Sequence, residues 1–493
     1  MNPAAVPRPA LERIALGILL LAAGFLVVHD IAIVAFPHDL IYGEGYLLRD
    51  AAMLRAGRSP YTPLAPPPAV VANYPPVYPL AFALATIPLG VGLLAGRLIS
   101  VLATVGCAWL LLRIARRALG PGGRAAAGFF APLLFLADLV VYYWSPYARV
   151  DMLALCFELA ALDAYHAALA AADGGERASF RRGRAFAVLA IFTRPTAVAA
   201  LAAIVVLLVL ARRGREAARE AALTAGAVGI IGLALSLATG GQFLAHTIAD
   251  NANAFRWGEL PRLLIDFATV HAPLLLGAAA YFVAGRAAEP RPPGDRLLAL
   301  FFAFAACGAL LVGKVGSSVN YFLEAVAAGA LLFGIALARS EGAHRRLLLV
   351  MAAAAPLLAT TVPWVPSLEL RLNPFPAMGR TPGAEDRRVG DAVAQIVATT
   401  PGEVLIEDAG FAVRAGKTVW AHPLVLSYLE VEGRYDPAPL AEMIKRREFS
   451  LIVLSYNFLS PSLRAAVGEA YRPDRMIEIR GRFKYVILRP AAG

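Results

Sequence analysis

The stretch from Lys314 to Glu324, with the sequence KVGSSVNYFLE, places two opposite charges between two long apolar segments. Charged side chains at membrane depth are costly and mark substrate or ion pathways by default. The Lys314 ammonium can bind an anion, the Glu324 carboxylate can pair with a cation, and Asn320 and Tyr321 offer further polar groups. We therefore predict a polar site at the mouth of a membrane cavity.

A second cation, Arg194, interrupts the apolar segment 184–211, which has Arg residues at both ends. Pro195 disfavours helix at the residue before it, so two short helices are expected to meet at Arg194 near the outer face. Together Arg194 and Lys314 are suited to a phosphate or diphosphate anchored in lipid. The alternative is that both side chains extend to the lipid headgroups.

Carboxylates occur in two of the predicted external links. Asp39 and Glu44 follow the first apolar segment, where a carboxylate can act as a general base on an alcohol, or can cap a helix. Asp151 opens another apolar segment directly after Arg149. It is either an acid stabilised at a helix N-terminus, or a ligand of a metal or an organiser of a phosphate site. The sequence leaves these alternatives open.

The composition places these residues in a polytopic helical membrane protein. Of the 493 residues, 59% are hydrophobic and 16% are charged, against about 25% charged residues in soluble domains. The apolar segments are continuous, which predicts helices. The net charge of +11 comes mainly from Arg residues between apolar segments. The preference of cytoplasmic loops for positive charge explains them, so no nucleic-acid partner is expected.

The Arg-rich links are expected to be cytoplasmic, and the links between them external. This predicts about eleven spanning helices of roughly 20 residues and one short re-entrant or interfacial helix at 76–92. The odd number leaves the C-terminus outside. The Arg- and Ala-rich usage is typical of a high-GC bacterium, which predicts its inner membrane and an extracytoplasmic tail. The Arg-rich links lie near 113–124, 177–184, 212–219, 286–296 and 339–346.

Three parts of the chain are expected to have separate roles. Residues 1–366 form the membrane module, and 37–75 is its first external loop, with an amphipathic helix over 45–56 in the membrane interface. Residues 380–493 are expected to form a small soluble α/β domain. Its predicted strands are 404–406, 451–454 and 485–488, and its predicted helices are 437–447 and 461–470. The chain has no nucleotide-binding fingerprint, so an activated substrate must come from elsewhere.

Taken together, these motifs resemble the GT-C superfamily of integral-membrane glycosyltransferases, on the branch of family 39, the RgtA/B/C/D-like proteins and the ArnT-like enzymes. The resemblance spans nearly the whole chain and depends on the order and spacing of its markers. The markers are Gly57 to Tyr61, Tyr74-Pro75-Pro76, Ala95 to Ser100, Arg149-x-Asp151, the break at Arg194 and Asn320 to Glu324.

The resemblance implies transfer of a sugar, hexose or pentose, from a polyprenyl-phosphate donor to a hydroxyl of a lipid, glycan or protein acceptor, with inversion. Many relatives carry Asp-Glu in the first loop; here Gly43 takes the Asp position, so Glu44 is the first choice of base and Asp39 the second. Glu44→Gln is expected to abolish transfer and leave expression intact. No cofactor is certain, but Asp151 is the candidate ligand of a divalent metal. The residues expected to bind substrate are Arg194, Lys314, Asn320, Tyr321, Glu324, Arg149, Tyr74 and Tyr61.

A second difference from the relatives concerns the candidate metal site. The branch that transfers aminoarabinose to lipid A has Glu-Lys-Pro-Pro where this chain has Asn73-Tyr74-Pro75-Pro76, so a metal site of that kind would lose a carboxylate. A membrane transporter is the main alternative function. A transporter favours internal repeats, which the sequence lacks. A non-catalytic scaffold would leave the cations at membrane depth unexplained.

Overall fold

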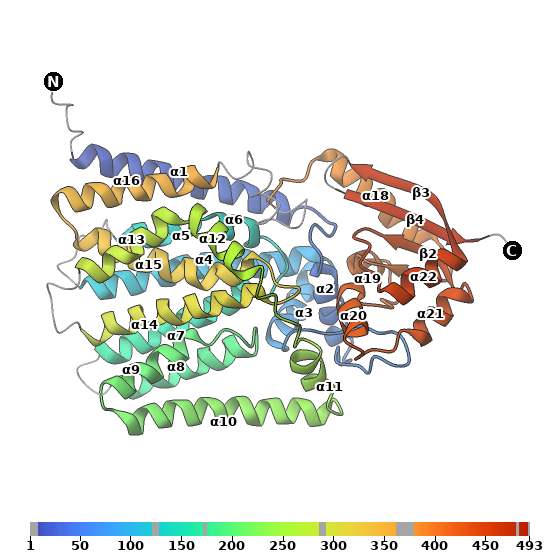
Figure 1. Cartoon of the computed structure of the whole chain (residues 1–493), viewed down its shortest axis with the longest axis horizontal. Coiled ribbons are helices and arrows are strands. Elements are labelled where there is room, and N and C mark those ends of the chain that lie inside the picture. The colour runs from blue at the N-terminus through green and yellow to red at the C-terminus, as the bar shows by residue number, and fades with distance from the viewer. Residues whose placement is uncertain are drawn as a thin grey trace.

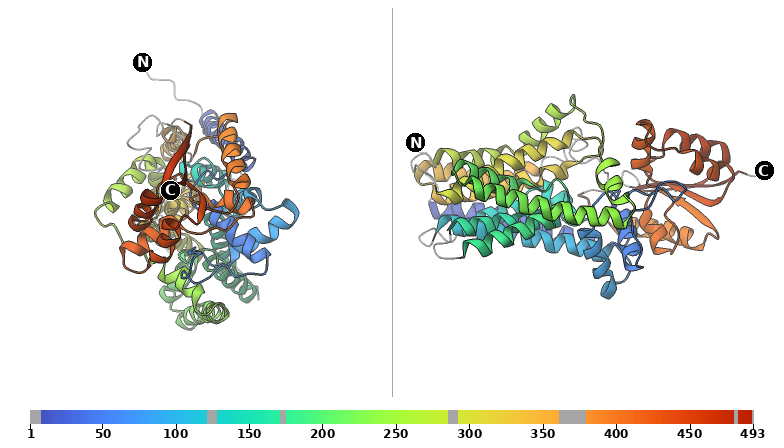
Figure 2. Two further views of the ribbon diagram at one scale, coloured as in Figure 1. Left: turned by 90° about the vertical axis from the view of Figure 1, so that its right-hand side faces the viewer. Right: turned by 90° about the horizontal axis from the view of Figure 1, so that it is seen from below.

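The computed structural model describes residues 8–120, 128–170, 175–284, 292–360, 379–479 and 483–491. An elongated helical bundle carries a smaller α/β domain at one end, and α1 begins at the other end (Figure 1). Two further views show the same division (Figure 2). The helices of the bundle are α1 Arg8–Val34, α3 Val77–Leu89, α4 Leu93–Leu119, α5 Phe130–Leu136, α6 Leu139–Trp144, α7 Asp151–Ala170, α8 Glu176–Ile191, α9 Ala199–Leu210, α10 Gly214–Ala238, α11 Gln242–Leu244, α12 Leu260–Val270, α13 Ala272–Ala284, α14 Pro293–Ala309, α15 Leu323–Arg339 and α16 Gly342–Ala359.

Within the described residues, seven helices are long and apolar enough to cross a membrane alone, or eight if α12 and α13, bent by 84°, count as one span. The predicted number of about eleven also needs the shorter α5–α6, α8 and α9, so that number stays a prediction. The short helix expected at 76–92 is α3, with 13 residues. The helical membrane fold with a small C-terminal sheet agrees with the prediction.

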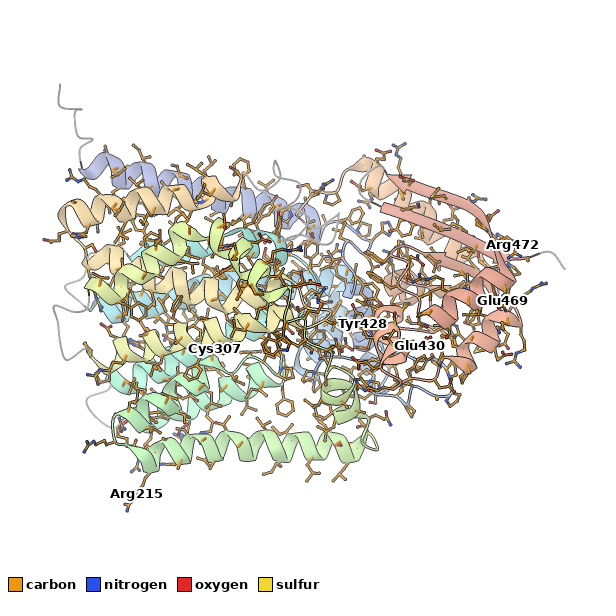
Figure 3. All side chains as sticks on the ribbon, viewed as in Figure 1. Arg215, Cys307, Tyr428, Glu430, Glu469 and Arg472 are labelled. Atoms are coloured by element: carbon orange, nitrogen blue, oxygen red, sulfur yellow. The ribbon has the colours of Figure 1, made fainter. Side chains whose placement is uncertain are left out.

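The ends of α4 and α15 and the starts of α8, α10 and α16, which carry the described Arg residues of these links, lie at the end of the bundle away from the α/β domain (Figure 1), where Arg215 is found (Figure 3). Ion pairs join the helices there. Arg117 contacts Asp163 at 2.7 Å, and Arg339 contacts Asp295 at 2.6 Å. Further pairs are Arg184 with Glu220 and Arg345 with Glu12. The Arg residues of the predicted cytoplasmic links therefore gather at one end of the bundle, and the side of the membrane that this end faces stays a prediction.

The helix predicted at 45–56 is α2, Glu44–Arg55, but its location differs from the prediction. Its first eight residues are buried, and it packs against α3 and against α19, Ala409–Arg414, of the C-terminal domain. An amphipathic pattern shows that one face is covered but does not say whether lipid or protein covers it. In this chain the cover is protein.

The C-terminal domain contains a four-stranded sheet in the order β1-β2-β4-β3. Strands β1 and β2 are parallel, and β4 runs antiparallel to both β2 and β3. All three predicted strands and both predicted helices are present. The sequence analysis did not predict β3, α18, α19 or α20. The elements are α18 Ala384–Thr399, β1 Glu403–Ile406, α20 Pro423–Val431, α21 Ala438–Lys445, β2 Phe449–Leu454, α22 Pro461–Ala470, β3 Tyr471–Ile479 and β4 Phe483–Pro490.

The first external loop is built into this domain. Ala69 forms a backbone bridge with Ala421 and packs in the core of the domain. The Tyr46 ring stacks on His422 at 3.9 Å between ring centroids, and the Tyr46 hydroxyl donates to the Glu407 carbonyl. The loop thus joins the membrane module to the domain and closes the end of the bundle where the candidate site lies.

Candidate functional site

Four segments bring polar residues together where the bundle meets the C-terminal domain. Asp151 is the first residue of α7, and Arg194 lies in the link between α8 and α9. Asn320 and Tyr321 belong to the 3₁₀ helix Val319–Phe322, and Glu324 is in the first turn of α15. Asp151, Arg194, Asn320, Tyr321 and Glu324 are called the outer cluster below. The predicted break at Arg194 is present, because Pro195 ends the helix before it.

Arg194 stands at the centre of the outer cluster. Its guanidinium lies 3.3 Å from an oxygen of Asp151 and 4.0 Å from an oxygen of Glu324. The guanidinium also covers the Tyr321 ring at 4.4 Å from the centroid, a cation–π contact. The side chain amide of Asn320 donates to Asp151 at 2.8 Å. The structure therefore brings these five predicted residues into one site.

Arg149 and Tyr74 border the outer cluster through Trp144. The indole N–H of Trp144 donates to Asp151 at 2.6 Å, and the Arg149 guanidinium lies 5.7 Å from the Trp144 ring. Arg149 also donates to the Tyr74 hydroxyl at 2.9 Å. Tyr61 does not join the cluster; its hydroxyl donates to the Tyr74 carbonyl and fixes that backbone. Tyr61 is thus a support for the predicted binding residue Tyr74.

Lys314 reaches the site from a loop whose backbone is hydrogen-bonded to a second loop. Residues 254–256 and 313–315 exchange backbone hydrogen bonds, and the Lys314 ammonium donates to Asn251 at 3.2 Å. Partial burial and the nearby Arg194 charge lower the pKa of Lys314. Tyr428 of α20 lies at the junction of the two parts (Figure 3) and is close to Gly316 of this loop. The C-terminal domain therefore covers the Lys314 loop.

The charges at the site are unevenly compensated. Arg194 already has two carboxylate partners, Asp151 and Glu324. Neither Arg149 nor Lys314 forms an ion pair with any carboxylate of the described residues. The Nε atom of Arg149 is buried and has no hydrogen-bond partner there. Because a phosphate is attracted by uncompensated positive charge, Arg149 and Lys314 are better placed than Arg194 to bind one.

Glu44, the first-choice base, is fully committed to structure. The Arg97 guanidinium donates to both of its oxygens, at 2.8 and 2.7 Å. The backbone N–H groups of Leu40 and Ala148 donate to the same carboxylate, and both Glu44 and Arg97 are 0% exposed. Four donors fill the acceptor sites of a carboxylate, and no acceptor hydroxyl can reach it. This geometry is that of a structural ion pair.

Asp39, the second choice, faces the C-terminal domain. Its carboxylate is buried against the backbone of Gly45 and Gly410, at the junction with α19. Burial, together with the neighbouring Glu44 charge, raises the pKa of Asp39 to about 7. Such a pKa suits a general base, but Asp39 forms no contact with the outer cluster among the described residues. The geometry does not favour Asp39 as the base either.

Gly43 explains why the first loop supplies no reachable acid. It has φ +103°, a conformation that favours glycine. A Cβ added there would lie 1.9 Å from a guanidinium nitrogen of Arg149. Arg149 therefore fills the space that a side chain at this position would use.

Residues that the sequence analysis did not select also shape the site. Glu158 lies two turns along α7 from Asp151 and is 1% exposed. One of its oxygens accepts from Ala200 at the start of α9, and the other has no partner among the described residues. The seven-residue spacing from Asp151 puts both acids on one helix face, a signal that was present in the sequence. Trp144 carried no such signal.

The surroundings of Asp151 do not fit a divalent metal. Its two oxygens accept from Trp144 and Asn320, and the positive Arg194 is 3.3 Å away. A metal needs several anionic or neutral acceptor ligands and repels a guanidinium. In the part of the chain that the structure describes, no group of three His, Cys, Asp or Glu side chains is arranged to hold a metal.

Comparisons with known proteins agree with this architecture. Residues 73–237, a third of the chain, match the family described as dolichyl-phosphate-mannose-protein mannosyltransferase. No curated protein sequence matches the chain. Its structure is similar to ArnT from Cupriavidus metallidurans bound to undecaprenyl phosphate, with TM-score 0.63 and 16% identity, over 97% of this chain and 98% of that one. It is also similar to the archaeal oligosaccharyltransferase AglB from Archaeoglobus fulgidus in complex with an inhibitory peptide and a dolichol-phosphate, with TM-score 0.52 and 12% identity, over 96% and 74%. The predicted resemblance to the GT-C superfamily is confirmed at the level of the fold.

Proposed function

We propose that this chain, which has the GT-C fold, is a glycosyltransferase that moves a hexose or pentose from a polyprenyl-phosphate donor to an acceptor hydroxyl. The observation that carries the proposal is the pair of cations, Arg149 and Lys314, without an acidic partner among the described residues. An uncompensated cation near membrane depth calls for an anionic ligand, and a lipid phosphate supplies one. The lipid phosphates bound to ArnT and AglB support the same class of donor.

In the proposed reaction, the acceptor oxygen bonds to the anomeric carbon while the bond from that carbon to the phosphate oxygen breaks. The polyprenyl phosphate leaves with the electron pair of that bond, and Lys314 and Arg149 stabilise its charge. The hydroxyl proton passes to a carboxylate of the outer cluster. Direct displacement in one step inverts the configuration of the sugar.

The carboxylate that we propose as the base is Glu324. Both oxygens of Asp151 already accept hydrogen bonds. Glu324 keeps 7% exposure, and its contact with Arg194 is long, at 4.0 Å. A base must be within reach of the proton that it removes, and Glu324 meets that condition better than Glu44 or Asp39. Arg194 then orients the two acids, and Asn320, Tyr321 and Tyr74 line the site.

The proposed location is the inner membrane of a bacterium, with the C-terminal domain on the extracytoplasmic side. The basic end of the bundle supports this orientation. The candidate site lies at the opposite end, where the C-terminal domain covers the Lys314 loop. A donor carried by a polyprenyl chain would reach that end from within the bilayer.

The test is transfer of radiolabelled sugar by the purified chain from synthetic polyprenyl-phosphate donors, with and without EDTA. We expect polyprenyl phosphate to be released only from donors that carry the phosphate. EDTA should not reduce the rate of this release. Absence of turnover across a broad panel of donors and acceptors, with the protein folded, would contradict the proposal and favour a transporter. A loss of activity in EDTA that returns with a divalent metal would contradict the assignment of Asp151.

A further inference from the structure

The turn after α20 brings an arginine of the C-terminal domain to the membrane module. Helix α20 ends at Val431, and Gly433 follows with φ +69° and donates its N–H to the Glu430 carbonyl. The N–H of Arg434 donates to the Leu429 carbonyl. This pair of bonds, closed by a glycine with positive φ, is the Schellman motif that ends many helices. The motif turns the chain away from the helix axis and leaves Arg434 against the membrane module.

Arg434 caps a helical segment of the membrane module. Its guanidinium donates to the carbonyl of Ala249, the last residue of the π-helix Ala245–Ala249, and lies 3.4 Å from a carboxylate oxygen of Asp250. A second nitrogen of the same guanidinium pairs with Glu432 at 2.8 Å, which fixes its orientation. Arginine near a helix C-terminus bonds the last carbonyls, which lack partners within the helix. Arg434 thus ties the end of this π-helix to the C-terminal domain.

The chain continues directly from this contact to the partner of Lys314. Asn251 follows Asp250, and its side-chain oxygen accepts from the Lys314 ammonium at 3.2 Å. In the part of the chain that the structure describes, the ammonium forms no other hydrogen bond or ion pair. Residues 250–254 are in neither helix nor strand, so their position depends on contacts with other elements. The place of the Lys314 ammonium therefore depends on how residues 249–251 are held.

Two further contacts hold the loops that carry Asn251 and Lys314. The ring of Tyr428, on α20, lies close to Gly316, where an added Cβ would be 3.3 Å from a ring carbon. On the side of the membrane module, the Asn251 amide donates to the Asn73 carbonyl at 3.3 Å. The C-terminal domain thus contacts both loops, one through the guanidinium of its turn and the other through this ring.

We propose that Arg434 is a positioning residue of the donor site. By holding residues 249–250 it sets the place of Asn251, and through Asn251 it sets the place of the Lys314 ammonium. The C-terminal domain thereby raises the affinity for the donor phosphate, because a cation that is already in place need not be ordered when the ligand binds. The identity of the donor rests on the proposed glycosyl transfer, whereas the dependence of Lys314 on Arg434 does not.

The proposal is tested with variants of the full chain in detergent. Arg434→Gln removes the charge that faces Asp250, whereas Arg434→Lys keeps the charge and can still donate to the Ala249 carbonyl. Arg472→Gln is the matched control, because Arg472 also donates to a carbonyl near a helix end, that of Gly468 in α22, at the far end of the domain (Figure 3). Only variants that elute as folded protein in size-exclusion chromatography are compared.

The first readout needs no ligand. An amine-reactive reagent is added, and the labelling rate of Lys314 is followed by mass spectrometry, with the exposed Lys445 as the internal reference. We expect Arg434→Gln to speed the labelling of Lys314, because the ammonium loses its fixed partner. Arg434→Lys and Arg472→Gln should leave the rate unchanged. An unchanged rate in Arg434→Gln would overturn the proposal.

The second readout is the Kd for undecaprenyl phosphate without a sugar, measured by microscale thermophoresis, so that it needs no turnover. We expect Arg434→Gln to weaken binding about 2- to 30-fold, the range for coupling through intermediate residues. In the Lys314→Met background, Arg434→Gln should have little further effect, because residues that act through one another are not additive. Equal weakening in both backgrounds would overturn the proposal, since Arg434 would then act on binding without Lys314.

The outcomes separate the positioning role from the proposed function. If no sugar is transferred in any assay while both readouts follow the expected pattern, the proposed function is wrong and the positioning role stands. If sugar is transferred while Arg434→Gln leaves the KM for the donor unchanged, the positioning role is wrong and the proposed function stands.

Discussion

Two buried arginines face acids in this molecule, and their surroundings differ. Arg97 and Glu44 are both 0% exposed; Arg97 forms two short hydrogen bonds with Glu44 and also donates to the carbonyls of Ile33, Phe36 and His38. Arg194 is shared between Asp151 and Glu324 through longer contacts of 3.3 and 4.0 Å. The two sites are linked along the chain, because Ala148, whose N–H donates to Glu44, lies three residues before Asp151.

The comparison separates a structural ion pair from a site that can still change partners. A buried charged pair with every donor and acceptor satisfied holds its neighbours in place, and removing one partner costs much stability. The Arg194 site is less saturated, so a ligand can exchange contacts there at lower cost. Burial alone did not distinguish the two, since both arginines are nearly inaccessible to solvent. The number and length of the contacts that each arginine makes distinguish the two sites.

The largest expected effect is on catalysis, at the Arg194 site. Glu324→Gln should lower kcat for sugar transfer by about 10²–10⁴, the usual contribution of a general base, while the thermal stability changes little. Transfer of radiolabelled sugar and thermal unfolding in detergent check the two parts. Glu259→Gln is the matched control, because Glu259 is an exposed acid that pairs with Arg256 in a loop near the junction. Unchanged kcat in Glu324→Gln would end its assignment as the base.

The next largest effect is expected on the free energy of unfolding, at the pair of Arg97 and Glu44. Glu44→Gln leaves Arg97 buried without its carboxylate, which should lower the free energy of unfolding by about 3–5 kcal/mol. Folded protein that remains should keep its kcat. This reverses the effect expected from the resemblance, in which Glu44 was the base. A variant of normal stability that has lost all transfer would show that the comparison of the two arginines is mistaken.

Removing an uncompensated cation should weaken donor binding and also lower kcat, because the same cation stabilises the leaving phosphate. Lys314→Met or Arg149→Met should raise the KM for the donor roughly 10–100-fold, as expected for loss of a hydrogen bond between charged groups worth about 1.5–3 kcal/mol. The control is Lys417→Met, because Lys417 donates to the carbonyls of Thr400 and Gly402 away from the site. If Arg194→Met alone raises KM and the other two do not, the phosphate binds to Arg194 as first expected.

The smallest expected effect is the pH dependence of stability that comes from Asp39. The pKa of Asp39 is raised to about 7 by burial and by Glu44, above its unfolded value near 3.9. The folded state therefore binds the Asp39 proton more tightly, and this contribution to stability is present at low pH and is lost as pH rises through 7. The difference in melting temperature between the wild type and Asp39→Asn should grow from pH 5 to pH 8, with the variant the more stable at pH 8. A difference independent of pH would contradict the raised pKa.

Much of the architecture could be predicted because it depends on local signals. Pro195 marks the break at Arg194, and the run from Asn320 to Glu324 marks polar groups at a helix start. The strands at 404–406 and 451–454 are short runs of branched apolar residues between polar segments. In each case the signal lies within a few residues of the feature that it predicts.

The roles of Glu44 and α2 could not be predicted because they depend on distant partners. Glu44 is separated from Arg97 by 53 residues, and no local pattern reveals that the two meet. The face of α2 that was expected to contact lipid contacts α19, which is more than 350 residues later in the chain. Whether an acid is a base or half of an ion pair is decided by such neighbours.

The attachment of the first loop to the C-terminal domain also has a consequence for biosynthesis. His38 bonds to Asp391, Tyr46 to Glu407 and His422 to the Val71 carbonyl, across separations of 353, 361 and 351 residues. During translation the first loop must therefore wait for its partners until most of the chain has been inserted. A chain that stops before residue 424 has its membrane helices but not the cover over the Lys314 loop. Completion of synthesis and completion of the site therefore coincide.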